Sequence, residues 1–144
     1  MSTPIVDAID ALVTLWTGLT PPDRTSVTYH HVDQAEVPSW TVLDRGFRFA
    51  LPVRAAPAGQ SADATKTLAE WVLVAQYHVA RRGRGFLDFA KAVANETSQL
   101  AMAAESKASW PTGVSNVFVE PVSPEEEPEG AVVTFTFTVL TEDS

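Results

Sequence analysis

The heptapeptide Val133-Thr134-Phe135-Thr136-Phe137-Thr138-Val139 alternates large apolar side chains with threonines. Because successive side chains of a β-strand point to opposite faces of a sheet, this alternation predicts a strand with one apolar face and one polar face. β-branched and aromatic residues, which fit the pleated surface of a sheet, make up the whole segment. We therefore expect Phe135 and Phe137 to lie in the core.

The sequence before this strand predicts the other half of an antiparallel hairpin. A second strand is expected over residues 114–122, and the alternating segment belongs to a strand over residues 131–141. The connecting residues 123–130 hold four glutamates next to Pro124, Pro128 and Gly130: Glu125, Glu126, Glu127 and Glu129. Because proline cannot donate to a sheet ladder, we expect this acidic hairpin loop to stay outside the sheet.

The net charge of −8 is concentrated in the last third of the chain. Residues 108–144 contain seven acidic residues and no Lys or Arg, whereas residues 1–107 contain 11 acidic and 10 basic residues. This balance argues against a general affinity for nucleic acid backbones or anionic membranes, since both reward Lys and Arg. The simpler interpretation is that the acidic residues serve solubility.

The composition indicates one α+β domain over residues 1–144, because a chain of this length with 45% apolar residues can bury a sizeable core. The absence of cysteine excludes disulfides, thiolate zinc sites and cysteine nucleophiles. No stretch approaches the roughly 20 apolar residues that span a bilayer, and the N-terminus lacks the pattern of a secretory signal. We expect synthesis in the cytoplasm.

The N-terminal segment predicts an amphipathic helix over residues 3–17. Apolar residues from Ile5 to Trp16 fall on one helical face. Thr3 is the candidate N-cap, Pro4 occupies the first helical position and Gly18 ends the helix.

Two strands are expected next, over residues 25–32 and 40–53. In the second, the apolar side chains change from even to odd positions around residues 44–46. Because a slip of one residue inverts the faces of a strand, we expect a bulge or a tight turn there. Arg48 and Arg54 then face away from the apolar row, toward solvent or a partner.

Two helices are expected in the middle of the chain. After a loop of small residues at 55–60, Ser61 caps a helix that ends at Gly83 and has an apolar stripe at helical spacing: Leu68, Trp71, Val72, Ala75 and Val79. Residues 86–107 predict the second helix, before Pro111. The expected order is thus α-β-β-α-α-β-β, which favours a mostly antiparallel sheet of about four strands with helices packed on one face.

His30, His31 and Asp33 are the residues that a metal or catalytic site would use. Two adjacent histidines on a strand point to opposite faces, so both could bind one ion only across a bulge. Neither a Gly-x-Ser-x-Gly elbow nor a phosphate-binding loop occurs. We therefore expect no catalytic, metal or cofactor site, and a protein that is not an enzyme.

A basic cluster of Arg81, Arg82 and Arg84 is a candidate contact for an acidic partner. The alternative is that these arginines are solvated and complement the dipole at the end of the preceding helix. The four glutamates of residues 123–130 are the second candidate, as contacts to a partner or as the lining of a channel.

The layout resembles that of the tail terminator, or tail completion, proteins of tailed bacteriophages and phage-like tail particles. The resemblance rests on the N-terminal helix, a long strand ending in Phe47-Arg48-Phe49-Ala50-Leu51-Pro52-Val53, a central helical block, and a C-terminal hairpin closing with Thr134-Phe135-Thr136-Phe137-Thr138-Val139. The helical block of residues 62–107 is longer than usual in that family, which leaves open a different component of the neck.

This resemblance implies a virion structural protein without enzymatic activity. Such a protein forms a homo-oligomeric ring of six copies that caps the tail tube and binds the tube protein and the head-side connector. DNA passes through the ring without specific binding, and glutamates that face a channel would repel its phosphates.

Two alternatives come from other classes of protein. A small adaptor would dock through the basic cluster or the acidic loop. A ligand-binding or enzymatic domain would use His30, His31 and Asp33 in a cleft of the sheet.

Overall fold

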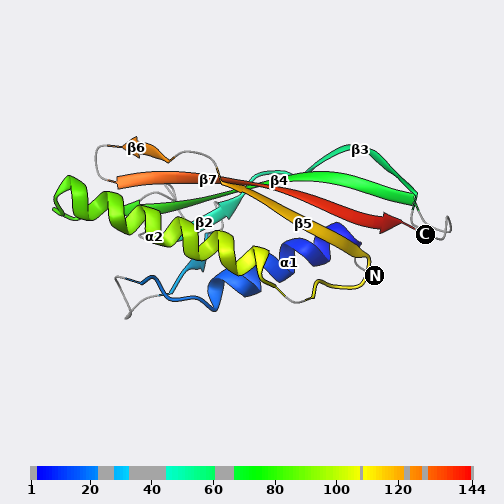
Figure 1. The fold of residues 1–144 in the computed structure, drawn as a ribbon, viewed down its shortest axis with the longest axis horizontal. Helices are drawn as coiled ribbons and strands as arrows, with labels where there is room; N and C mark the ends of the chain where they lie inside the picture. Colours follow the sequence, from blue (N-terminus) through cyan, green and yellow to red (C-terminus); the bar gives the residue numbers. More distant parts are fainter. Residues whose placement is uncertain are drawn as a thin grey trace.

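The computed structural model describes residues 3–22, 28–32, 45–60, 67–107, 109–121, 124–127 and 130–143. These residues form two helices and seven strands in the order α1, β1, β2, β3, β4, α2, β5, β6 and β7 (Figure 1). All seven strands belong to one mixed sheet.

Two long strands form the spine of the sheet. β4 (Thr67–Ala80) and β7 (Gly130–Asp143) have 14 residues each and pair antiparallel along their whole lengths. At one end of the ladder Gly130 lies so close to β4 that an added Cβ would clash with the Val79 carbonyl oxygen and lie 2.8 Å from His78 Nε2. Only glycine therefore fits at this position without a shift of the backbone.

The five shorter strands flank this spine. β2 (Gly46–Phe49) and β3 (Val53–Gln60) pair antiparallel with successive halves of β4, and β1 (His30–His31) runs parallel to β2. β5 (Val114–Pro121) and β6 (Glu125–Glu127) pair in the same way with successive parts of β7. In the described residues the sheet thus ends at β1 and β3 on one side and at β5 and β6 on the other.

Both helices cover the same face of the sheet, α1 (Pro4–Thr17) and α2 (Phe86–Glu105), and they contact each other (Figure 1). Inward side chains of the spine are completely buried beneath them: Leu73, Ala75, Tyr77, Val79, Val133, Phe135, Phe137 and Val139. Trp16 of α1 packs among these side chains, with its ring centroid 5.3 Å from those of Phe47 and Phe135. The core therefore lies between the two helices and the spine.

The predicted helix over residues 61–83 is wrong, because residues 67–80 are strand β4. Leu73, Ala75, Tyr77 and Val79 alternate inward at a period of two, and all four are fully buried. Trp71, Val72, Val74 and Tyr77 are also β-branched or aromatic residues, which favour strands. The same residues also fit helical spacing, and pairing with the equally long β7 favours the strand.

The predicted order α-β-β-α-α-β-β and the mostly antiparallel sheet of about four strands are therefore also wrong. Residues 55–60, expected as a loop, belong to β3, whose register shifts beside Pro57. The strand expected over residues 40–53 is β2, which ends at Phe49, and residues 40–44 lie outside the described residues. The acidic segment also differs from expectation, since residues 125–127 form β6.

Other predictions are confirmed. α1 begins at Pro4 and ends before Gly18, with Thr3 at the N-cap position, although the Thr3 side chain makes no capping hydrogen bond. α2 occupies most of the predicted residues 86–107. β5 and β7 form the expected antiparallel pair, and Arg45 makes the expected turn before β2 with a positive φ of 64°.

The buried row of β7 supplies a direct test of this fold. Phe137→Ala removes a fully buried ring and leaves a cavity, so we expect a loss of about 3–5 kcal/mol in the free energy of unfolding. Thr136→Ala, one residue away on the opposite face, is the control and should cost much less. Urea unfolding measures both variants, and equal stability of Phe137→Ala and the parent would contradict the assigned face.

Candidate functional site

β1 holds the two histidines that the sequence singled out. His30 is half-buried and His31 is exposed, with the His31 ring 5.6 Å from that of Phe47. Asp33 lies outside the described residues. Within the described ranges, no group of three or more His, Cys, Asp or Glu side chains is placed to hold a metal ion.

A buried ion pair that the sequence did not predict lies between the sheet and α2. Arg45 precedes β2 and Glu96 lies on the inner face of α2, and both side chains are fully buried. Arg45 Nε donates to Glu96 Oε1 at 2.5 Å. The backbone of Arg45 is also anchored, because its N–H donates to the His78 carbonyl and its own carbonyl accepts from His30.

Two tyrosines extend this buried polar network. The Tyr29 hydroxyl donates to Glu96 Oε1 at 3.0 Å, and the Tyr77 hydroxyl bonds to Thr97 Oγ1 at 2.7 Å. Gln99 of the same helix donates to the Thr20 carbonyl, after α1. The inner face of α2 is thus fixed to the sheet and to the chain that follows α1.

Burial raises the pKa of both hydroxyls above the ordinary tyrosine value. For Tyr29, the nearby Glu96 carboxylate adds to this increase, since a second negative charge beside it would be unfavourable. For Tyr77, burial is the largest cause, and the hydrogen bond to Thr97 acts in the opposite direction. Both groups therefore remain protonated over the usual range of pH.

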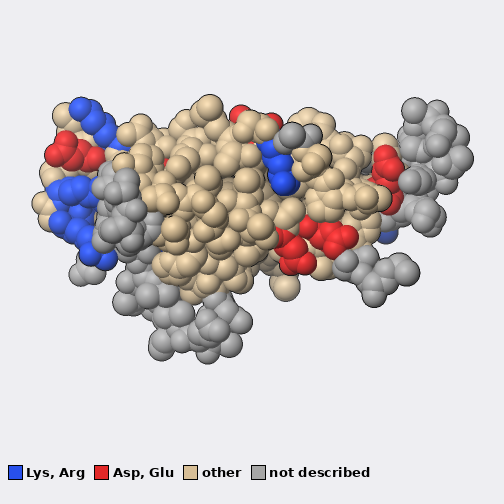
Figure 2. Space-filling view, turned by 90° about the horizontal axis from the view of Figure 1, so that it is seen from below, with Lys and Arg blue, Asp and Glu red and all other residues tan. Residues whose placement is uncertain are grey.

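The basic cluster lies in the turn between β4 and α2, where Arg82 and Gly83 both have positive φ. Arg81 Nε donates to the Arg84 carbonyl at 2.9 Å, and Arg84 Nη2 donates to the Ala80 carbonyl at 2.9 Å. Figure 2 shows basic side chains gathered at this end of the molecule. Because the turn precedes α2, the arginines lie near the positive end of a helix dipole, and the expected complement to a helix C-terminus is wrong.

The acidic candidates form an edge strand instead of a loop. Glu125, Glu126 and Glu127 pair with β7, and the side chains of Glu125 and Glu126 are exposed. Glu129 lies outside the described residues. The prediction that the prolines keep this segment out of the sheet is therefore wrong.

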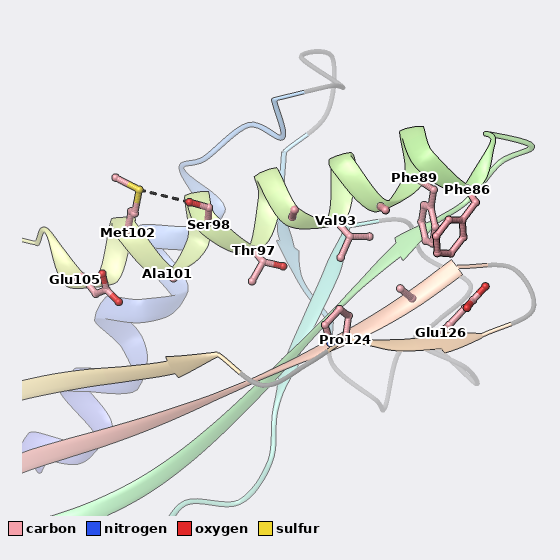
Figure 3. Close-up of a pocket in the computed structure, with 13 residues that line it drawn as sticks. Phe86, Phe89, Val93, Thr97, Ser98, Ala101, Met102, Glu105, Pro124 and Glu126 are labelled. Carbon is pink, nitrogen blue, oxygen red and sulfur yellow. Dashed lines mark hydrogen bonds between the residues drawn. The ribbon is translucent and has the colours of Figure 1, made fainter.

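A groove of about 680 Å³ runs between α2 and the β6–β7 edge (Figure 3). Its walls are mainly apolar, and they include Phe86, Phe89, Val93, Ala101, Met102 and Pro124. Phe86 is 63% exposed and Met102 is 60% exposed, although both are large apolar side chains. We call this feature the α2 groove.

Both charged residues that line the α2 groove are acidic, Glu105 and Glu126. The two hydroxyl groups in its wall are already engaged, since Thr97 bonds to Tyr77 and Ser98 donates to Met102 Sδ at 3.6 Å. Such a lining suits contact with an apolar surface that carries positive charge.

No protein-family model matches the sequence, and no curated protein is similar to it at a significant level. Among the described residues, neither helix combines the length and the apolar character needed to cross a membrane.

The chain has two tyrosines, Tyr29 and Tyr77, and both have raised pKa values, which predicts a loss of stability at alkaline pH. Above about pH 10 the unfolded chain releases protons that the folded chain retains, so stability should fall by about 1.4 kcal/mol per pH unit for each tyrosine. Below that pH the contribution is fully present. Phenolate absorbance should rise together with loss of circular dichroism, whereas a tyrosine that ionises near pH 10 in the folded protein would contradict the network.

The buried ion pair makes a second prediction. Glu96→Gln leaves the Arg45 guanidinium buried without its counter-charge, so we expect a loss of about 3–5 kcal/mol. Glu105→Gln, on the exposed side of the same helix, is the matched control. The double variant Arg45→Met with Glu96→Leu should be clearly more stable than Glu96→Gln in urea unfolding, and a wild-type midpoint for Glu96→Gln would show that the pair does not secure α2.

Proposed function

We propose that the protein is a structural ring component of a phage or phage-like tail, which caps the tail tube and joins it to the head connector. It acts by assembly and not by catalysis. Its partners are further copies of itself, the tube protein and the connector protein, and DNA passes through the ring without specific binding.

The observation that carries this proposal is the presence of strand edges on both sides of the spine. In the described residues β3 and β5, with eight residues each, pair with one neighbour only. An edge of this kind presents unpaired backbone groups that readily pair with another chain. Edges on opposite sides suit assembly in which each copy contacts the next, as in a closed ring.

Exposed apolar side chains near both edges also support assembly. Leu51 is 89% exposed and Val53 is 59% exposed on the β3 side, and Phe118 of β5 is 48% exposed on the other side. Scattered apolar residues are normal on a surface, but large side chains beside open strand edges are typical of contact surfaces.

The charge of the chain agrees with a passage for DNA. Glu125 and Glu126 project from the edge strand β6, and the chain carries a net charge of −8. An acidic lining would not retain the phosphate backbone, whereas a basic lining would slow the passage of DNA.

A small adaptor or ligand-binding domain is the second candidate, and the α2 groove favours it. A groove of about 680 Å³ with apolar walls lies within the size range of ordinary ligand sites, roughly 300–1,000 Å³. A compact monomer that binds apolar ligands, with no association between copies, would support this candidate over the ring.

The proposed function is tested by locating the protein in particles. Immunogold labelling of purified particles should place the protein where head and tail join, and deletion of its gene should leave heads and tails apart. Complementation with the intact gene is the control. Complete, infectious particles from the deletion strain would contradict the proposal.

The acidic residues give a sharper test of the passage for DNA. Replacing Glu125, Glu126, Glu127 and Glu129 with Gln should leave the melting temperature unchanged, because the side chains of Glu125 and Glu126 are exposed and surface charges contribute little to stability. The same variant should change particle assembly, DNA retention or infectivity in complementation, since it removes a local negative field. Unchanged values of all three would mean that these glutamates serve solubility alone.

A further inference from the structure

We propose that the α2 groove of one copy holds residues 50–55 of the next copy. The segment is Ala50-Leu51-Pro52-Val53-Arg54-Ala55, which leads from β2 into β3. This inference rests on the proposed ring for the association of copies, and it goes further by assigning the surfaces that meet.

The segment is exposed and apolar, and it carries a positive charge that would pair with the acidic lining of the groove. Five of its six residues are exposed, including Leu51 at 89% and Val53 at 59%, and Arg54 is its one charged residue. Its apolar side chains would otherwise remain in water. Burial of a single leucine side chain contributes on the order of 1.5–3 kcal/mol, so docking of Leu51 and Val53 would give a substantial gain.

The groove has the length and charge to receive this segment. Six extended residues span about 20 Å, whereas the helical wall from Phe86 to Glu105 spans about 29 Å. The two lining carboxylates, Glu105 and Glu126, lie toward opposite ends of the groove (Figure 3). The Phe86 end of the groove also carries Arg81 and Arg84, whose guanidinium carbons lie 6.0 and 5.8 Å from the centroid of the Phe89 ring, so Arg54 would meet its acidic partner at the Glu105 end.

The two surfaces lie on opposite sides of the spine. Residues 50–55 follow the β4 side of the sheet, whereas the α2 groove lies beside β6 on the β7 side. Each copy therefore contributes the segment to one neighbour and the groove to the other, so the contact is head-to-tail. Contacts of this kind generate rings when the rotation between copies closes.

A symmetric contact between two grooves covers less of the exposed apolar surface. It would leave Leu51 and Val53 of both copies in water. Docking of residues 50–55 in the groove covers the segment and the groove at once, so the segment is the better occupant.

Cysteine cross-linking tests this contact cleanly, because the chain contains no cysteine. Leu51→Cys and Met102→Cys place one thiol on the segment and one in the groove. Treated with a flexible bis-maleimide, a mixture of the two single variants should give a cross-linked dimer. Each single variant alone should give none, and the double variant should give a ladder that ends in a closed ring.

Val6→Cys on α1 is the control, since Val6 is 44% exposed and lies outside the groove lining. Its mixture with Leu51→Cys should not cross-link. A Leu51→Asp variant should associate roughly 10- to 100-fold more weakly, by the burial that it loses. Leu87→Asp, at an exposed position of α2 outside the groove lining, should associate normally.

Each other outcome overturns the proposed contact. Cross-linking of Met102→Cys with itself would indicate a symmetric contact between grooves. A ring in sedimentation without the mixed cross-link would reject this contact and leave the proposed function intact. A protein that stays monomeric at all concentrations would also reject it, and labelling of particles would then decide the proposed function separately.

Discussion

The antiparallel ladder between β4 and β7 is the constraint on which the rest of the fold depends. Its 14-residue strands keep one continuous register, so the inward side chains of both strands form one apolar surface for the two helices. Of the other strands, all but β1 pair directly with one member of this ladder. Among the described residues the sheet has edge strands on both sides of this ladder, and the proposed assembly uses these edges.

The buried network around Glu96 links this spine to the proposed contact surface. Glu96 and Thr97 fix the inner face of α2 to Arg45, Tyr29 and Tyr77. A buried ion pair is a weak source of net stability, because both charges lose their hydration, but its loss is costly and it selects one arrangement. The helix is thereby held at a defined position over the sheet, and its outer side remains available as a wall of the α2 groove.

The sequence predicted elements whose signals are local and unambiguous. The period of two in residues 133–139 suits a strand only, and Pro4 with Gly18 marks both ends of α1. In residues 67–80, apolar residues fit both the period of a helix and the period of a strand. The choice depends on pairing with residues that lie 50 or more positions later in the chain. Arg45 and Glu96 are likewise 51 residues apart, and the position of Glu96 on the apolar face of its helix was the one available signal. The α2 groove is formed by α2, β6 and β7 together, so the sequence alone did not reveal it.

In the proposed assembly, neighbouring copies cover the strand edges, the exposed apolar segment and the acid-lined groove of each subunit. Native mass spectrometry of the purified chain, alone and with the tube protein, measures this property directly. We expect one closed assembly at a fixed multiple of the 15.5 kDa chain. A monomer under both conditions, or a mass that grows without limit as concentration increases, would contradict a closed ring.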